Sequence, residues 1–332
     1  MKVEKLRVAI VGFGFMGKTH ALNILKSENM LLTAIVDSNI NINYHSGGNI
    51  ETDGIAPDIL STIPNYCTLD DCLANESIDL AYICVHTLAH YELAMKSLEN
   101  GLHVFIEKPF VLDVKEGHKL IGEAKQRNKK IGVGHVVRFM PAYSKLLDIY
   151  RNKLYGELKF ISLSRFSGVP DWGDWMERRE TFGSSGGALF DLVIHDIDFL
   201  QYMLGKPDEM YCNYIDGYLS KHDYINTFWF YDQSKINAKI EGGNIFPSQF
   251  PFEASYRALF ENAAVNWSSR SECQLNIITD NESQIITLEN LSKGYQEEAE
   301  YFAKCILEDL YPEECSAESS LETIELCYRH VM

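Results

Sequence analysis

The stretch VAIVGFGFMGKTH, residues 8–20, decides how the rest of the chain is interpreted. Its first four residues are apolar and β-prone, and glycines at positions 12, 14 and 17 then follow the spacing G-x-G-x-x-G. Between a strand and a helix, such glycines allow a sharp turn, let a pyrophosphate approach the backbone and let helix and strand pack closely. Residues 18–26 have the apolar spacing of that helix, whose N-terminus would attract phosphate. The stretch therefore predicts a dinucleotide-binding turn.

The run from Gly12 to Thr19 also matches a P-loop, which would bind a nucleoside triphosphate. A P-loop does not need Gly14, whereas a dinucleotide turn does. A dinucleotide site also needs an acid at the end of the next strand, about 20 residues on. Residues 31–36 predict that strand and Asp37 ends it. Because an apolar strand that ends in Asp also fits a magnesium-binding acid, this stretch alone leaves the P-loop open.

Asp37 also bears on the choice between NAD and NADP. A carboxylate at this position would bind the two hydroxyls of the adenosine ribose and would repel a 2′-phosphate. Residues 38–40 contain no Arg or Lys that would offset the repulsion. We therefore expect NAD as the cofactor, with NADP less favoured.

Length, composition and charge limit the class of protein. The chain has 332 residues, 46% hydrophobic and 23% charged, and a formal net charge of −17. The acidic balance argues against non-specific binding to nucleic acid or anionic membranes, because both need a positive surface. The eight cysteines show no C-x-x-C spacing, which indicates free thiols in a reducing cytoplasm and no zinc site. No signal or membrane-spanning pattern is present, so we expect a cytoplasmic protein.

The order of predicted elements changes near residue 130. Up to that point strands alternate with helices, which predicts parallel βαβ units and a doubly wound Rossmann sheet. Beyond it, six strand patterns between residues 209 and 288 follow one another without helices, which predicts an antiparallel sheet. Two helices, at about 294–310 and 317–329, close the chain. The fold class is α/β, with domains 1–130 and 131–332.

Three residues outside the glycine turn suggest chemistry. Lys108 directly follows a predicted strand, at the strand end where ligands bind in parallel sheets, although a surface lysine is the alternative. Asp191 and His195 are four residues apart on a predicted helix, 186–204, and so share one face. An imidazole beside a carboxylate can act as an oriented general base, and a capped helix with a hydrogen-bonded histidine is the alternative. No third ligand lies at helical spacing, so we expect no metal.

Four segments together resemble the glucose–fructose oxidoreductase / inositol dehydrogenase (Gfo/Idh/MocA) family. They are the glycine turn 12–17, GLHVFIEKP at 101–109, GVGHVVRF at 132–139 and GGALFDLVIHDID at 186–198. The resemblance covers nearly the whole chain and sets the P-loop aside. It implies an N-terminal NAD-binding Rossmann domain and a C-terminal α/β domain with a large, mainly antiparallel sheet for substrate binding and oligomerisation. It also implies NAD(P)-dependent oxidation of a hydroxyl of a sugar, cyclitol or related polyol by a homodimer or homotetramer.

The resemblance assigns roles to individual residues. It implies that Lys108, Asp191 and His195 are catalytic, with Lys108 and His195 touching the substrate, and that Arg138 binds substrate. His90 matches the histidine that begins the helix after the fourth strand. Many members have Thr-Pro-Asn before that histidine, whereas this chain has Val85-His86-Thr87. His86 is then either a contact on the cofactor side or a substituted loop residue, and we favour the loop residue. The expected cofactor contacts are Gly12, Phe13, Gly14, Phe15, Met16, Gly17, Asp37, Glu107 and Lys108.

One loop is a further substrate candidate. Residues 168–175 combine aromatic, small and acidic side chains, which suits a wall against a hydroxyl-rich ligand, and Asp174 is the expected hydroxyl acceptor. A packed aromatic loop is the alternative. Two other functions stay open: a non-catalytic dinucleotide-binding sensor, and a lyase or hydrolase that uses NAD transiently. The retained set of Lys108, Asp191 and His195 argues against the sensor.

Overall fold

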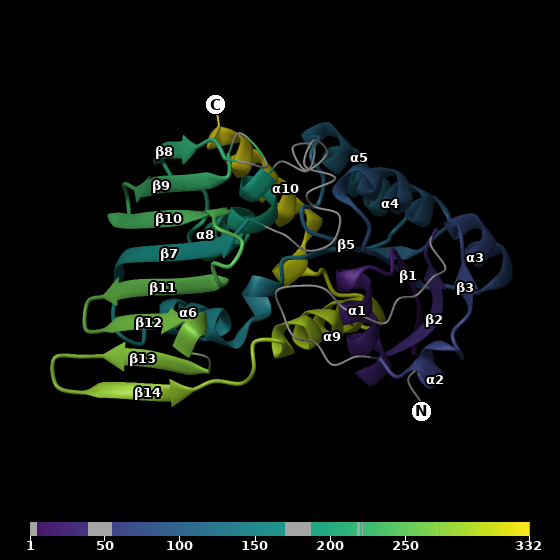
Figure 1. The fold of residues 1–332 in the computed structure, drawn as a ribbon, viewed down its shortest axis with the longest axis horizontal. Coiled ribbons are helices and arrows are strands. Elements are labelled where there is room, and N and C mark those ends of the chain that lie inside the picture. Colours follow the sequence, from purple (N-terminus) through teal and green to yellow (C-terminus); the bar gives the residue numbers. More distant parts are fainter. Residues whose placement is uncertain are drawn as a thin grey trace. The chain divides into compact units, whose positions relative to one another are not determined.

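The structure is a computed structural model that describes residues 5–38, 55–169, 187–217, 220, 222–271 and 273–331. By its internal contacts the chain divides into two compact units (Figure 1). Unit 1 comprises Met1–Val136 and Tyr295–Glu322, and unit 2 comprises Val137–Gly294 and Thr323–Met332. The sequence-based division placed residues 295–322 in the second domain, whereas their contacts place them in unit 1. A helix that returns from a distant part of the chain leaves no local pattern that reveals its packing partner.

Unit 1 is built on a six-stranded parallel sheet with the strand order β3-β2-β1-β4-β5-β6 (Figure 1). This is the doubly wound order in which the direction of winding reverses between β1 and β4. The strands are β1 (Leu6–Val11), β2 (Met30–Val36), β3 (Asn65–Tyr66), β4 (Leu80–Ile83), β5 (His103–Glu107) and β6 (Ile131–Gly134). The helices are α1 (Phe15–Lys26), α2 (Pro57–Leu60), α3 (Leu69–Asn75), α4 (His90–Glu99), α5 (Val114–Gln126) and most of α9 (Lys293–Leu307).

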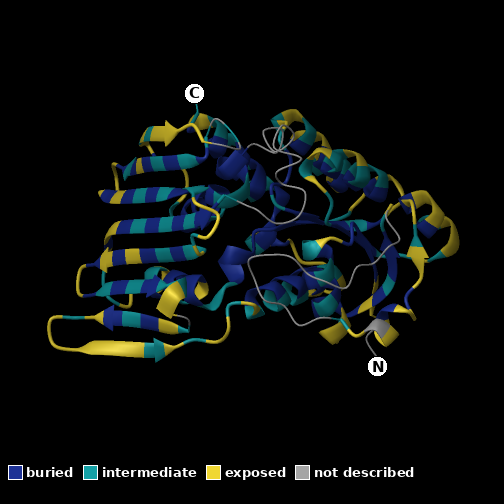
Figure 2. Ribbon diagram, in the orientation of Figure 1, coloured by how far each residue is buried: buried dark blue, intermediate teal, exposed yellow. Residues whose placement is uncertain are grey.

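Helix starts in unit 1 follow local capping chemistry. The Thr68 side chain accepts a hydrogen bond from the Asp71 N–H at the start of α3, and Asp113 accepts one from the Lys115 N–H at the start of α5. Strands β4, β5 and β6 are almost entirely buried, as expected for a parallel sheet covered by helices (Figure 2). Their carboxyl ends all lie at one edge of the sheet, where the predicted site residues of unit 1 are found.

Unit 2 contains an eight-stranded sheet with the order β14-β13-β12-β11-β7-β10-β9-β8. Only the pair β7–β10 is parallel within this described sheet, so the predicted antiparallel character is confirmed in the main. Buried and accessible residues alternate along its strands (Figure 2). The strands are β7 (Leu158–Gly168), β8 (Glu209–Ile215), β9 (Tyr224–Tyr231), β10 (Ile236–Phe246), β11 (Glu253–Phe260), β12 (Ala264–Ser268), β13 (Gln274–Ile278) and β14 (Ser283–Thr287).

The helices of unit 2 are α6 (Pro141–Arg151), a π-helical turn (Leu189–Val193) that leads directly into α8 (Ile194–Leu204), and the end of α10 (Ala317–Arg329). Among the helices of the described residues, none combines the length and apolar character that crossing a bilayer requires.

The sheet of unit 2 differs from the sequence-based expectation at two strands, β10 and β12. One of the six strand patterns covers residues 235–240, but β10 continues through Gly242 and Gly243 to Phe246. A Cβ at Gly243 would lie 2.1 Å from the Asp223 carbonyl oxygen, so the glycine permits close backbone approach rather than a turn. The short strand β12 was missed, because five residues give too little alternation to stand out.

Candidate active site

The glycine turn joins β1 to α1 and needs glycine for steric reasons. Gly12 has φ +91°, and a Cβ there would lie 2.7 Å from the Cys84 carbonyl oxygen. A Cβ at Gly17 would lie 2.0 Å from the Gly12 carbonyl oxygen. At Gly14, by contrast, a Cβ would meet nothing within 4 Å, and no side chain caps the N-terminus of α1. Open backbone before an uncapped helix start fits the pyrophosphate of a dinucleotide.

Thr19 separates the dinucleotide turn from the P-loop alternative. In a P-loop the hydroxyl at this position binds the magnesium ion. Here Thr19 is 4% exposed and its hydroxyl donates to the Phe15 carbonyl oxygen at 3.0 Å. The hydroxyl is thus used inside α1, which favours the dinucleotide reading. Phe15 and Met16 are half-buried beside the exposed Gly14, whereas Phe13 is only 6% exposed.

Asp37 follows β2 and reaches back to the glycine turn. Its Oδ2 accepts a hydrogen bond from the Phe13 N–H at 2.7 Å. A cation also lies within electrostatic range: burial lowers the pKa of Lys18, and the Asp37 carboxylate opposes that shift. Residues 38–40 contain no cation, but Lys18 on α1, which precedes Asp37 in the chain, is one that the sequence-based expectation left out. The repulsion of a 2′-phosphate is therefore weaker than we expected, and the preference for NAD over NADP stays a prediction.

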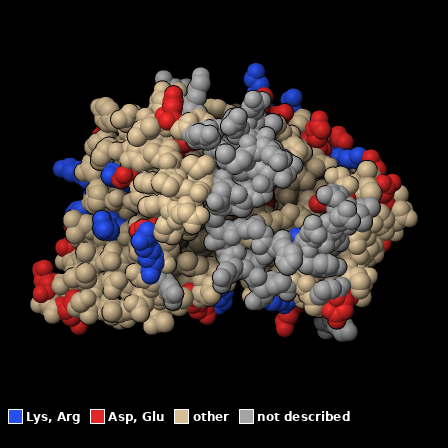
Figure 3. Space-filling model, viewed as in Figure 1, with Lys and Arg blue, Asp and Glu red and all other residues tan. Residues whose placement is uncertain are grey.

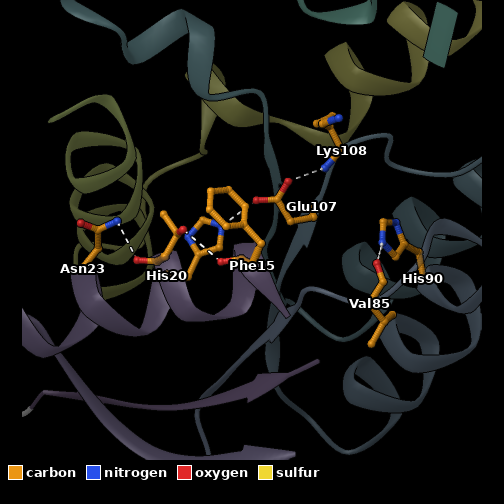
Figure 4. Close-up of polar contacts among 8 residues, drawn as sticks. Phe15, His20, Asn23, Val85, His90, Glu107 and Lys108 are labelled. Atoms are coloured by element: carbon orange, nitrogen blue, oxygen red, sulfur yellow. Dashed lines mark hydrogen bonds and ion pairs between the residues drawn. The ribbon is translucent and has the colours of Figure 1, made fainter. Parts of the chain in front are cut away.

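Lys108 lies half-buried just beyond β5, next to the buried Glu107 (Figure 4). Glu107 Oε2 accepts a hydrogen bond from the Lys108 backbone N–H at 3.2 Å, and Oε1 lies 2.6 Å from Nε2 of His20 on α1. The Lys108–Pro109 peptide bond is cis. The Glu107 carboxylate is thus engaged inside unit 1, so its direct contact with a cofactor stays a prediction.

His90 holds the chain on the other side of Lys108 (Figure 4). It is the first residue of α4 and is 1% exposed. Its Nδ1 lies 3.0 Å from the Pro109 carbonyl oxygen, and its Nε2 lies 3.0 Å from the Val85 carbonyl oxygen. Burial lowers the pKa of His90, and the hydrogen bonds to backbone carbonyls oppose this. His90 is therefore a link between two loops. His86 lies exposed before α4, and the choice between its two interpretations stays a prediction.

Asp191 and His195 lie at the junction of two helix types in unit 2. Asp191 belongs to the π-helical turn and His195 to the first turn of α8, and both are half-buried. The sequence predicts one α-helix here, but the observed helix is π-helical at Asp191, where each turn holds more residues than the 3.6 of an α-helix. The helical position of both residues is confirmed, and their cooperation in catalysis stays a prediction.

Two buried ion pairs involve aspartates that follow His195 on α8. Asp196 accepts hydrogen bonds at 2.9 Å from both Nε and Nη2 of Arg165 on β7. Asp198 accepts them from Nε and Nη2 of Arg138, at 2.8 and 2.5 Å. Both carboxylates are 0% exposed. The pairs anchor the helix that carries His195, and sequence reasoning assigned no role to either aspartate.

Arg138 is enclosed within unit 2. The resemblance implied contact with substrate, but its side chain is 0% exposed, paired with Asp198 and stacked on the Tyr202 ring at 4.5 Å. This guanidinium holds α8 through Asp198, and its contact with a substrate stays a prediction. The other predicted substrate residue, Asp174, lies outside the described residues. Within the part of the chain that the structure describes, no group of three His, Cys, Asp or Glu side chains could hold a metal ion.

Together, the doubly wound sheet, the glycine turn and the acid after β2 define a Rossmann-type dinucleotide-binding protein. Comparison with known families agrees. Residues 6–135 match the family model "Oxidoreductase family, NAD-binding Rossmann fold", and residues 143–232 match "GFO/IDH/MocA C-terminal domain". The chain belongs to the GFO/IDH/MocA oxidoreductase family.

Individual relatives are more distant. The chain is 24% identical over 206 residues to myo-inositol 2-dehydrogenase of Thermotoga maritima and 27% identical over 214 residues to D-glucoside 3-dehydrogenase of Escherichia coli K12. These matches cover 61% and 62% of this chain and 56% of each relative, so the chain spans little more than half the length of these curated relatives. UDP-N-acetylglucosamine 3-dehydrogenase from Acidithiobacillus ferrooxidans shares the fold with a TM-score of 0.79 at 19% identity, over 98% of this chain and 96% of that one.

Proposed function

We propose that this protein is a cytoplasmic NAD-dependent dehydrogenase that oxidises a hydroxyl of a sugar, a cyclitol such as inositol, or a related polyol. The observation that carries the proposal is the arrangement at the carboxyl edge of the parallel sheet. The glycine turn follows β1, Asp37 follows β2 and Lys108 follows β5, around the point where the winding reverses. The names of the curated relatives support sugars and cyclitols as the substrate class.

The chemistry divides between cofactor and side chains. When bound, the nicotinamide accepts the hydride from the carbon that carries the hydroxyl. The hydroxyl proton must leave at the same time, and His195 would accept it. Asp191 would orient the imidazole and stabilise its cationic form. Lys108 would donate a hydrogen bond to the reacting oxygen, and Asp174 would accept one from a neighbouring hydroxyl.

The first experiment is a binding titration monitored by NADH fluorescence, with NADPH and ATP in parallel. Tight NADH binding with weaker NADPH binding supports the roles of the glycine turn and Asp37. ATP binding without NADH binding would revive the P-loop and overturn the proposal. A screen of inositols and sugars for NAD reduction then identifies the substrate. NADH binding with no turnover would favour the sensor, and product formation without net NADH would favour the lyase or hydrolase.

His195 provides the mutational test. His195→Ala is expected to lower kcat by about 10²-fold, the usual contribution of a general base, without changing NADH affinity. The matched control is His118→Ala, because His118 lies exposed on α5. An unchanged kcat in the His195 variant would remove the proposed base.

We also propose that unit 2 forms a homodimer or homotetramer through the open face of its sheet. Phe160 on β7 and Leu259 on β11 are paired across the two strands and are 36% and 49% exposed. On the face drawn in Figure 3, the basic side chains of the described residues lie interspersed with acidic ones. Light scattering of the wild type and of Leu259→Glu tests this association, since a charge on the apolar face should dissociate the oligomer.

A further inference from the structure

We propose that His20 is a positioning residue for the reaction, which acts through the Glu107 carboxylate on the backbone of Lys108. The inference rests on the proposed role of Lys108. It assigns a task to a histidine that the glycine motif does not include and that no proposed step uses.

The burial of His20 and Glu107 shows that the pair is a built feature. His20 is 0% and Glu107 6% exposed, and the two atoms that meet, Nε2 and Oε1, are 2.6 Å apart. Rings of Tyr82 and Phe105 surround the imidazole, with centroids 5.1 and 5.3 Å away. An ionisable side chain in such an apolar setting is costly without a hydrogen-bond partner. Each member therefore depends on the other.

The geometry also indicates which proton makes the bond. His20 Nδ1 is buried and has no hydrogen-bond partner among the described residues. A proton on Nδ1 would be a buried donor without an acceptor, whereas a proton on Nε2 is donated to the Glu107 carboxylate. The neutral tautomer with its proton on Nε2 therefore gives both that N–H and Glu107 Oε1 a hydrogen-bond partner. His20 thus serves as a hydrogen-bond donor that fixes the rotamer of Glu107.

The fixed carboxylate then holds Lys108. With Oε1 bound by His20, Oε2 is directed at the Lys108 N–H, 3.2 Å away (Figure 4). Strand β6 leaves space for this arrangement, because a Cβ at Gly134 would lie 3.2 Å from Oε1. On the far side of Lys108, His90 binds the Pro109 carbonyl oxygen. The backbone of Lys108 is therefore restrained from both sides, and small errors in placing a catalytic group cost rate.

The test compares three substitutions at position 20. Glutamine places a side-chain N–H near the position of Nε2, asparagine places one near Nδ1, and leucine fills the space without a donor. We expect His20→Leu and His20→Asn to lower kcat about 10-fold while the KM for NAD changes less than twofold, and His20→Gln to recover most of kcat. If His20 only fills space, His20→Leu should keep kcat and His20→Gln should lower it. A higher kcat for His20→Leu than for His20→Gln would therefore overturn the proposal.

A matched control and a second measurement keep the test independent of activity. His103 is the first residue of β5, the strand that ends at Glu107, and its Nδ1 accepts a hydrogen bond from the Lys130 N–H. Because His103 lies at the opposite end of β5 from Glu107, His103→Leu should leave kcat unchanged. Hydrogen–deuterium exchange of the Lys108 amide, in the full-length protein, should accelerate in His20→Leu and return toward the wild-type rate in His20→Gln. Unchanged exchange in His20→Leu would refute the link. If the wild type oxidises no polyol, the proposed function fails, and the exchange result still decides the role of His20.

Discussion

The two units bury ionisable groups next to their proposed catalytic residues, but they do so with different chemistry. Unit 1 places one imidazole–carboxylate pair, His20 and Glu107, beside Lys108. Unit 2 places two guanidinium–carboxylate pairs, Arg165–Asp196 and Arg138–Asp198, on the helix that carries His195. An imidazole can be neutral, so the pair in unit 1 need not bury a positive charge. A guanidinium is always charged, so the pairs in unit 2 are permanent and their loss leaves a buried charge.

This difference indicates that the pair in unit 1 and the pairs in unit 2 have different structural roles. In unit 1 the carboxylate bonds to a backbone N–H and sets a local loop conformation. In unit 2 the carboxylates hold the whole of α8 in place: Asp196 binds Arg165 on β7, and Asp198 binds Arg138. We therefore expect substitutions in unit 1 to affect rate more than stability, and those in unit 2 to affect stability first.

The largest effect should come from breaking a buried pair in unit 2. Asp198→Ala leaves the Arg138 guanidinium buried without its partner and also removes the acceptor of the Thr323 hydroxyl at 2.9 Å. We expect the free energy of unfolding to fall by about 3–5 kcal/mol, measured by urea denaturation. The control is the double variant Arg138→Leu/Asp198→Leu, which should be more stable than Asp198→Ala because no charge stays buried. A loss below about 1 kcal/mol would contradict the anchoring role.

A second effect, somewhat smaller, is a pH dependence in unit 2. Burial lowers the pKa of His330 from its usual value to about 4. The neutral ring is fully used, since Nδ1 donates to the Leu326 carbonyl oxygen at 2.7 Å and Nε2 accepts from the Trp229 indole N–H at 3.2 Å. The folded state thus binds fewer protons than the unfolded state between pH 6.5 and about 4, and stability falls as the pH drops through that window.

The contribution of His330 is at most about 3.5 kcal/mol, because its pKa falls from 6.5 to about 4 and one pKa unit corresponds to about 1.4 kcal/mol. His330→Leu should lose less stability than the wild type between pH 7 and pH 4.5, measured by the midpoint of urea unfolding at each pH. Exposed His118→Leu should keep the wild-type slope. Equal slopes in all three proteins would show that His330 does not carry the dependence.

Much of the fold was predictable because its signals are local. Glycine spacing and strand–helix alternation are set by neighbours in sequence, and the doubly wound parallel sheet that they predict is confirmed. The features that were missed depend on residues distant in sequence. Lys18 approaches Asp37 only after β2 has returned beside β1. Likewise, Arg138 matched a substrate position by motif, and only tertiary packing revealed its burial against Asp198.

The smallest predicted effect concerns an exposed ion pair in unit 1, which isolates burial as the cause of the differences above. Arg7 and Asp79 form a bidentate pair like that of Arg138 and Asp198, with 2.9 and 2.7 Å bonds, but their side chains are 45% and 33% exposed. Hydrogen bonding to Arg7 lowers the pKa of Asp79. The pair therefore stabilises the fold above the usual Asp pKa of about 3.9, and that contribution is lost as the pH falls through the lowered value.

Exposure should reduce this contribution far below that of the buried pair. Arg7→Gln is expected to cost about 0.2–1 kcal/mol at pH 7 and less in 1 M salt, because solvent and salt screen the two charges. Urea denaturation at low and high salt measures it, and Asp198→Ala should show little salt dependence in the same series. A cost for Arg7→Gln as large as that for Asp198→Ala would mean that bidentate geometry, and not burial, determines the strength of these pairs.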